Sequence, residues 1–261
     1  MTLQILPSDI FSVYEKKQRY TIHKHINEIY AMRHKFNDSS SLIASIYSSL
    51  IEGSGIDYNT YHLNKSTGYT SKGMKQIDDL QEAYQFAQRH VLNEANFLKT
   101  HILISKNLDL DKKFKGKYRS NAEVQVGNHL GTIYTGCASS KVESAMKKLF
   151  EDIKTLKSQK LTYNQAFYYA SMIHLVLVKI QPFADGNGRA ARLLEKWFLS
   201  EILSNKIWYI QSEAYYLYNR EKYYSNLQIG DTFETVDYGA SSQFLLMLTD
   251  TFKLSKKGSL I

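Results

Sequence analysis

Hydrophobic residues recur at helical spacing along most of this chain. Between residues 20 and 35, for example, Ile22, Ile26 and Ile29 lie three to four positions apart, which predicts a helix there. Residues 58–75 are polar and contain glycine, which predicts a surface loop. The same periodicity predicts further helices over residues 40–53, 77–97, 139–156, 163–180, 191–203 and 233–252, while residues 94–104 either continue the helix at 77–97 or begin a new one.

The segment at residues 163–180 is apolar on almost every side, which is typical of a helix in the centre of a core. Thr162 precedes this segment and is placed to cap its N-terminus. His174 lies inside it, and we interpret His174 as a hydrogen-bonded core histidine. Seven residues of helix, about 10 Å, separate it from Gln181, so it is too distant to act on the same proton.

A short stretch near the middle of the chain has a different pattern. Val124, Val126, Ile133 and Tyr134 favour β-structure, and glycines lie between them, so residues 124–134 are predicted to form a short hairpin. No repeat and no linker is visible, so residues 1–261 are expected to form a single helical domain. The predicted fold class is all-α: a helical bundle around a central buried helix, with one short hairpin.

Composition narrows the functional classes. The chain has 261 residues, 43% of them hydrophobic and 22% charged, which is ordinary for a globular protein. No apolar run reaches the ~18 residues of a membrane span, no secretory signal is visible, and a single cysteine, Cys137, fits a reducing compartment. A cytoplasmic protein is therefore expected. The net charge of +8 comes from scattered lysines, so a nucleic-acid binder is a disfavoured alternative.

Residues 181–192, Gln-Pro-Phe-Ala-Asp-Gly-Asn-Gly-Arg-Ala-Ala-Arg, contain the clearest candidate chemistry. A proline and glycines interrupt two helical segments, which predicts a helix, a tight loop and a second helix. The free amides of residues 186–188 would open that second helix and form an anion site. Arg189 and Arg192 share one helix face, and Asp185 could hold Mg²⁺ against phosphates. The pattern indicates a cradle for a nucleotide di- or triphosphate.

The same string resembles the Fic-domain motif His-x-Phe-x-(Asp/Glu)-Gly-Asn-Gly-Arg-x-x-Arg. Seven positions match it: Phe183, Asp185, Gly186, Asn187, Gly188, Arg189 and Arg192. The first position departs from it, because the family has His where this chain has Gln181. The resemblance implies a Fic core over residues 77–252 and transfer of AMP from ATP to a Ser, Thr or Tyr hydroxyl of a target protein.

The resemblance also implies a role for each matching residue. Asp185 would hold Mg²⁺ against the α- and β-phosphates, and the Gly186–Asn187–Gly188 segment would bind phosphate oxygens. Arg189 would neutralise the β-phosphate, and Arg192 would grip the γ-phosphate. Phosphorylating Doc-type relatives have Lys where this chain has Gly188, which favours AMP transfer over phosphate transfer.

The family His removes the proton of the attacking hydroxyl, and Gln181 cannot, because an amide does not take up a proton near pH 7. Losing a general base typically costs ~10²–10⁴-fold in rate. Two interpretations stay open: an adenylyltransferase with reduced activity, and a non-catalytic nucleotide-binding pseudoenzyme that regulates a partner protein. A homodimer is an open alternative to a monomer.

An N-terminal region, residues 1–60, contains a second resemblance at about residues 40–53. Ser48, Glu52 and Gly53 match the (Ser/Thr)-x-x-x-Glu-(Gly/Asn) inhibitory motif of Fic proteins. Ser48 and Glu52 lie four apart and therefore share one helix face. The resemblance implies that Glu52 competes with the γ-phosphate for Arg192.

Two further segments resemble parts of the Fic site. The sequence Gly-Lys-Tyr-Arg at 116–119 precedes the predicted hairpin, as in the flap that docks the target protein of Fic enzymes, so the flap is expected at about residues 116–136. An exposed edge of such a hairpin can recruit an extended peptide. The sequence Asn-Arg-Glu-Lys-Tyr-Tyr at 219–224 resembles the segment that approaches adenine, which makes Asn219 and Tyr223 candidate adenine-binding residues.

Overall fold

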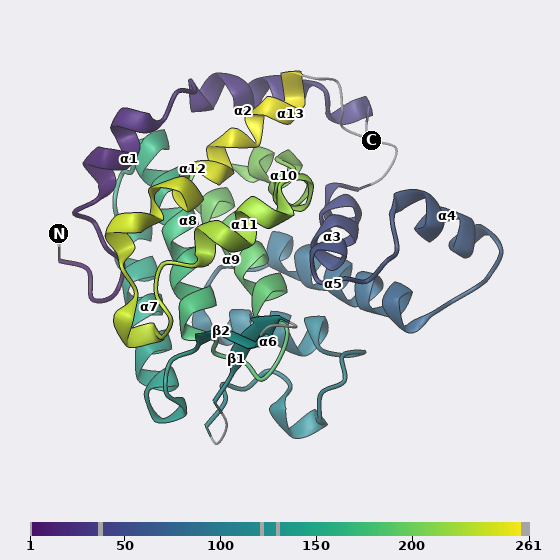
Figure 1. Cartoon of the computed structure of the whole chain (residues 1–261). Helices are drawn as coiled ribbons and strands as arrows, with labels where there is room; N and C mark the ends of the chain where they lie inside the picture. The colour runs from purple at the N-terminus through teal and green to yellow at the C-terminus, as the bar shows by residue number, and fades with distance from the viewer. Residues whose placement is uncertain (1, 36–38, 121–122, 129–130, 257–261) are drawn as a thin grey trace.

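The computed structural model describes residues 2–35, 39–120, 123–128 and 131–256 (Figure 1). The fold is mostly helical with one short hairpin, as predicted. The longer helices are α1 (Phe11–Lys17), α2 (Ile22–Ala31), α3 (Ser40–Ile51), α4 (Tyr58–Ser66), α5 (Lys72–Arg89), α6 (Glu94–Ile104), α7 (Ser139–Lys157), α8 (Tyr163–Ile180), α9 (Asn187–Ile202), α10 (Ser212–Tyr218), α11 (Arg220–Leu227), α12 (Ser242–Asp250) and α13 (Phe252–Lys256). Short 3-10 turns η1 to η5 lie at Arg33–Lys35, Lys112–Phe114, Asn205–Tyr209, Phe233–Thr235 and Tyr238–Ser241.

Helix α8 is the centre of the molecule, and α1, α2, α7, α9 and α12 pack around it (Figure 1). This surrounding explains why its sequence is apolar on nearly every side. The predicted N-terminal cap is confirmed: the Thr162 hydroxyl accepts from the Gln165 amide (3.2 Å), and the Gln165 side chain accepts from the Thr162 amide (2.9 Å). Helix α9 lies alongside α8, and the loop that joins them contains the motif of residues 181–192.

The expectation of a loop at residues 58–75 is wrong, because residues 58–66 form α4. Asp57 caps this helix by accepting a hydrogen bond from the Thr60 amide (2.8 Å). Tyr61 is buried in a small cluster with residues of α3 and α5, namely Leu42, Ile46, Met74 and Ile77. The helix is mostly polar because only one of its faces is covered.

The predicted helix at 77–97 is two helices. Helix α5 ends at Arg89, and the Asn93 side chain caps α6 by accepting from the Asn96 amide (2.9 Å), so the second of the two alternatives for residues 94–104 is confirmed. The predicted helix at 233–252 is also interrupted. Its first part is a pair of 3-10 turns, because Asp237 accepts from the Gly239 amide (2.9 Å) and closes a local turn there.

The predicted hairpin is confirmed as strands β1 (Gln125–Asn128) and β2 (Gly131–Thr135), which pair antiparallel near the lower end of α8 and α9 in Figure 1. Gln125 lies opposite Thr135, and Val126 opposite Tyr134. Within the flap expected at 116–136, residues 121–122 and 129–130 lie outside the described residues. No helix among the described segments combines the length and apolar character that crossing a membrane requires.

A buried carboxylate helps to attach the N-terminal segment to the core. Asp152 of α7 accepts hydrogen bonds from the amides of Gln4 (2.7 Å), Ile5 (2.8 Å) and Leu6 (2.9 Å). Leu6, buried beside it, belongs to the main hydrophobic core. These contacts join positions nearly 150 residues apart in sequence, so no local pattern predicts them.

We expect Asp152→Ala to lower the free energy of unfolding by about 2–4 kcal/mol, because three amides lose their acceptor at a buried site. Urea denaturation followed by circular dichroism measures this change. The matched control is Glu151→Ala at the neighbouring exposed position, with an expected change within about 0.5 kcal/mol. Equal losses in the two variants would contradict the tethering role of Asp152.

Candidate functional site

The loop between α8 and α9 reverses the chain at Gln181. Gln181 ends α8 in the left-handed conformation (φ 51°, ψ 61°), and it is the one non-glycine residue with positive φ in the described part of the chain. Arg119 stabilises this turn: its Nε donates to the Gln181 carbonyl (2.6 Å) and its Nη2 to the carbonyls of Ile180 (3.2 Å) and Cys137. A cation at the end of a helix satisfies carbonyls that have no intrahelical partner.

Side-chain contacts of Asn187, Phe183 and His101 hold the remainder of the loop in place. The side-chain oxygen Oδ1 of Asn187 accepts from the backbone amide of Phe183, and the side-chain nitrogen Nδ2 of Asn187 donates to the backbone carbonyl of Phe183, both at 2.8 Å. The Phe183 ring stacks on His101 with 3.6 Å between ring centres. Burial lowers the pKa of His101 to about 4, so the ring is neutral: its Nδ1 accepts from the Gly116 amide (2.9 Å), and its Nε2–H donates to the Asp185 carbonyl (3.0 Å).

A cavity of about 830 Å³ lies above this loop, which is within the size range of small-molecule sites. Its walls come from the loop, the first turn of α9, the hairpin and α11. Among the residues predicted from the sequence, the cavity is lined by Glu52, Gln181, Asp185, Gly186, Asn187, Gly188, Arg192 and Tyr223. Ser48, Gly53, Arg189 and Asn219 are not among the residues that line it.

Arg192 is fully buried and joins α9 to α3. Its Nε donates to the Ser48 hydroxyl (2.8 Å), and its Nη2 donates to the Ser48 carbonyl (3.1 Å) and to Glu52 Oε1 (2.6 Å). The third nitrogen, Nη1, donates to the Tyr223 hydroxyl (3.3 Å). The structure therefore brings both residues of the helix face at Ser48 and Glu52 to the same guanidinium. Gly53, with φ 85°, lets the chain leave α3 directly after Glu52.

Electrostatics favour the charged form of both partners in this pair. Burial acts to raise the pKa of the Glu52 carboxyl, but the positive charges of Arg192 and Arg189 outweigh it, so the pKa is lowered. Burial acts to lower the pKa of the Arg192 guanidinium, but the negative charge of Glu52 outweighs this effect, so the pKa is raised. The Glu52 side chain keeps 29% exposure on the cavity side. Its carboxylate also abuts Gly188, where a Cβ would collide with Oε1. An anionic group thus already occupies the N-terminus of α9.

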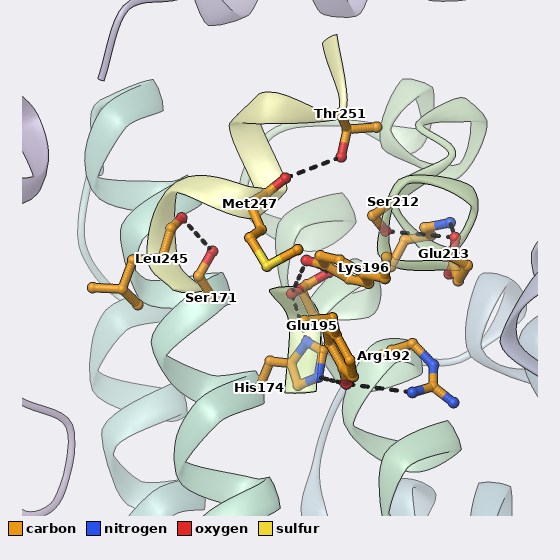
Figure 2. Close-up of polar contacts among 12 residues, drawn as sticks. Ser171, His174, Arg192, Glu195, Lys196, Ser212, Glu213, Leu245, Met247 and Thr251 are labelled. Carbon is orange, nitrogen blue, oxygen red and sulfur yellow. Dashed lines mark hydrogen bonds and ion pairs between the residues drawn. The ribbon is translucent and has the colours of Figure 1, made fainter. Parts of the chain in front are cut away.

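Behind Arg192 lies a buried polar network that connects α8, α9, α10 and α11 (Figure 2). His174 Nδ1–H donates to Glu195 (2.8 Å), which also accepts from the Tyr216 hydroxyl (2.9 Å). With Nδ1 protonated, His174 Nε2 accepts the hydroxyl proton of Tyr223 (2.9 Å), the same hydroxyl that accepts from Arg192. His174 is therefore a hydrogen-bonded core histidine, as predicted, and it holds Tyr223 in place.

A second buried pair lies next to this network. Lys196 Nζ donates to Glu213 (2.6 Å), which also accepts from the Tyr84 hydroxyl (2.6 Å). Glu195 and Lys196 therefore place opposite charges one turn beyond Arg192, each with its own partner (Figure 2). The sequence analysis did not identify these partners, because their positions in the sequence look like solvent-facing charges on an amphipathic helix.

Two residues expected in the site are placed differently from the others. Arg189 is 7% exposed, and its Nε has no hydrogen-bond partner in the described structure, so a buried donor is available beside the cavity. Asn219 lies at the start of α11, where its amide donates to the Tyr215 carbonyl (2.9 Å). The structure thus gives Asn219 a local partner in the preceding helix.

Asp185 is the residue expected to hold Mg²⁺. It is exposed on the cavity floor, and its Oδ1 accepts from the Gly186 amide (2.6 Å). Within the described ranges, no group of three or more His, Cys, Asp or Glu side chains could hold a metal by itself. A single exposed carboxylate fits Mg²⁺ that takes its other ligands from phosphates and water.

Three charged residues that line the cavity were not predicted from the sequence: Lys179, Arg220 and Glu221. Lys179 belongs to α8, whose apolar pattern hid it, although its position two residues before Gln181 was a usable signal. Arg220 and Glu221 lie inside the segment at 219–224, from which only Asn219 and Tyr223 were selected.

Comparison with known proteins agrees with this geometry. Residues 91–199 match the model of the Fic/DOC family. Over 214 residues the chain is 28% identical to a protein adenylyltransferase Fic of Aedes aegypti; the match covers 74% of this chain and 38% of the mosquito protein. The chain thus spans little more than a third of that relative.

Solved structures share the fold. A Fic family protein from Desulfovibrio desulfuricans aligns with a TM-score of 0.72 and 18% identity, covering 99% of this chain and 76% of that one. A Fic domain containing signaling protein from Bacteroides thetaiotaomicron aligns with a TM-score of 0.64 and 19% identity, covering 96% and 95%. Residues 91–199 of this chain therefore resemble the Fic/DOC family, and the chain as a whole shares the mostly helical fold of these Fic proteins.

Proposed function

We propose that this chain is a protein adenylyltransferase that transfers AMP from ATP to a hydroxyl of a target protein. One observation carries the proposal: the buried guanidinium of Arg192 holds an anionic carboxylate, that of Glu52, beside the N-terminus of α9 in a nucleotide-sized cavity. A site that holds a carboxylate by a guanidinium, next to the first amides of a helix, has the chemistry needed for a phosphate group.

The residues of the cavity divide the triphosphate among them in this proposal. The amides of residues 186–188 and the Arg189 guanidinium bind the α- and β-phosphates, and Arg192 binds the γ-phosphate. The Asn187 side chain closes the loop, and since an amide nitrogen carries two N–H donors, a phosphate contact is compatible with this arrangement. Mg²⁺ bound at Asp185 would neutralise charge on the phosphates. Tyr223 also lines the cavity and is the candidate residue for contacting the adenine.

The reaction is a displacement at the α-phosphorus. The oxygen of the target hydroxyl forms a bond to the α-phosphorus, the bond to the bridging oxygen of the β-phosphate breaks, and pyrophosphate leaves with that electron pair. The hydroxyl proton must go to a base. Positioning and charge neutralisation supply most of the catalysis in such reactions.

Residues 40–53 restrain the Fic core at 77–252 in this proposal. While Glu52 occupies Arg192, the γ-phosphate cannot bind there, and the α-phosphate is not aligned for attack. The pair is more than a surface ion pair, because the Arg192 guanidinium is fully buried. Displacement of Glu52 by a phosphate would replace one anion with another, so the buried charge keeps a partner.

The hairpin is the proposed docking element for the target protein. Strand β2 is bridged on its outer side to Thr232, so the outer edge of β1 is the edge that an extended peptide would join. Val124 and Val126 of this segment line the cavity, which would place an acceptor hydroxyl of the peptide above the loop.

A second function is supported by Gln181. Its side-chain nitrogen donates to the Val178 carbonyl (2.9 Å), and the amide cannot act as a base. A non-catalytic module that binds nucleotide and regulates a partner protein is therefore the alternative.

We expect Glu52→Gly and Glu52→Gln to bind ATP with Mg²⁺ at least about tenfold more tightly than the unmodified chain, since about 1.4 kcal/mol of competition suffices for that change. Isothermal titration calorimetry measures the affinity. The control is Glu82→Gln, which removes an ion-paired carboxylate of α5 that does not line the cavity. Unchanged affinity in both Glu52 variants would argue against the inhibitory role.

We expect the Glu52→Gly protein to transfer label from α-³²P ATP to protein in a cell lysate, and Gln181→His to increase that rate at neutral pH, since histidine is then a largely unprotonated base. The matched control is Gln181→Asn, which also suits the left-handed backbone but has no base. Retained ATP binding with no label in any variant would favour the non-catalytic alternative.

A further inference from the structure

Lys179 is a buried cation in the wall of the cavity that the proposed function leaves unused. The Lys179 residue is 2% exposed. It lies two positions before Gln181 in the chain and lines the same cavity. Its Nζ lies 3.9 Å from the ring centre of Tyr134 on β2. The Tyr134 hydroxyl donates to the Lys179 carbonyl (2.6 Å), so this ring and the end of α8 are held together.

Burial shifts Lys179 towards its neutral form, although the ammonium form still predominates at neutral pH. Burial lowers the pKa of its ammonium group to about 8, against a smaller opposite effect of the Asp231 carboxylate. Among the described residues, no carboxylate lies within ion-pair distance of Nζ; the ring face of Tyr134 covers it instead. A lysine amine near its pKa can accept a proton, which the amide of Gln181 cannot do.

The other titratable groups of the cavity are less suited to this task. Glu52 is held by Arg192, and it must leave before the γ-phosphate binds. Asp185 is the proposed Mg²⁺ ligand. Glu221 lies on α11 with the adenine-side residues, whereas Lys179 contacts the hairpin on which the target would dock. Burial raises the pKa of the Tyr223 phenol, which therefore stays protonated.

We propose that Lys179 is the general base of this chain, taking the proton of the attacking hydroxyl in place of the motif histidine. The inference rests on the proposed function. As the hydroxyl oxygen bonds to the α-phosphorus, its proton moves to the neutral Lys179 amine, which becomes an ammonium group, and pyrophosphate leaves with the electron pair of the broken bond. The ammonium group then returns its proton to solvent.

The position of Lys179 fits the direction from which the hydroxyl would arrive. A peptide that joins the edge of β1 lies beside Val124 and Val126, which line the cavity together with Tyr134 and Lys179. The Gln181 amide would orient the hydroxyl by a hydrogen bond, while the amine accepts the proton. Orienting the hydroxyl and accepting its proton are thus the tasks of two different residues, Gln181 and Lys179.

The test uses the full chain with Glu52→Gly, and it measures label transferred from α-³²P ATP to lysate protein. Lys179→Met should lower the initial rate by ~10²–10⁴-fold, the usual effect of a general base. Lys179→Arg should lower it as strongly, because arginine keeps the positive charge but is not deprotonated. The matched control is Lys206→Met, which removes another lysine over a tyrosine ring and lies outside the cavity.

The second arm restores the motif base. In the presence of Gln181→His, the loss caused by Lys179→Met should shrink to less than about tenfold, since the histidine then takes the proton. A structural or phosphate-binding role of Lys179 would give the same loss in both backgrounds. That result, or a loss of less than threefold from Lys179→Met alone, would overturn the proposal.

The pH dependence of kcat/KM supplies an independent measurement. The base must be neutral to act, so activity should rise with pH and level off above about pH 8, the pKa of Lys179 in the free protein. With Gln181→His, the rise should move to about pH 6.5, the ordinary pKa of histidine. A profile unchanged by that substitution would contradict the assignment.

Calorimetry distinguishes failure of the Lys179 assignment from failure of the proposed function. If the Glu52→Gly protein binds ATP but transfers no label, Lys179 is not a base, and the chain is a nucleotide-binding module. If it binds no ATP, the proposed function itself fails. Thermal melting of Lys179→Met, which replaces the stem by an apolar chain of similar length, checks that any loss is not one of folding.

Discussion

A fully buried guanidinium is the constraint on which much of this structure depends. Removing the charge of Arg192 from water is costly unless each donor finds an acceptor. Its acceptors come from Ser48 and Glu52 of the α3 segment and from Tyr223 of α11. Helix α3 ends about 40 residues before the segment 91–199 that matches the Fic/DOC model. It is therefore held against α9 by Arg192, the same side chain that faces the cavity.

The buried polar network next to Arg192 fixes the orientation of the side chains around its guanidinium. Glu195 is satisfied by His174 and Tyr216, and His174 in turn orients the Tyr223 hydroxyl. A buried network in which some polar groups lacked hydrogen-bond partners would destabilise the low-dielectric interior. A network in which all of them are paired makes the surrounding core more rigid. Fixed polar contacts thus support the site on the side of the core, while the hairpin and the Glu52 carboxylate form other parts of the cavity wall.

The position of Gln181 shows how fold and chemistry separate in this chain. The left-handed turn, the Arg119 contact with its carbonyl and the stacking of Phe183 on His101 depend on backbone atoms or on neighbouring residues. None of them requires a histidine side chain at position 181. The geometry of the loop is therefore independent of which side chain stands at position 181.

The sequence by itself determined the helical class, the central helix, the hairpin and the loop of residues 181–192, because periodicity, capping residues and helix-breaking residues act locally. It also placed Ser48 and Glu52 on one helix face. It did not reveal α4, whose single buried residue, Tyr61, depends on a cluster from α3 and α5. The pairing of Glu52 with Arg192 followed from the family resemblance and not from any local pattern, and only the tertiary structure brought Lys179 into the cavity. Those contacts link positions far apart in the chain, and the packing around α8 decides which side chains meet.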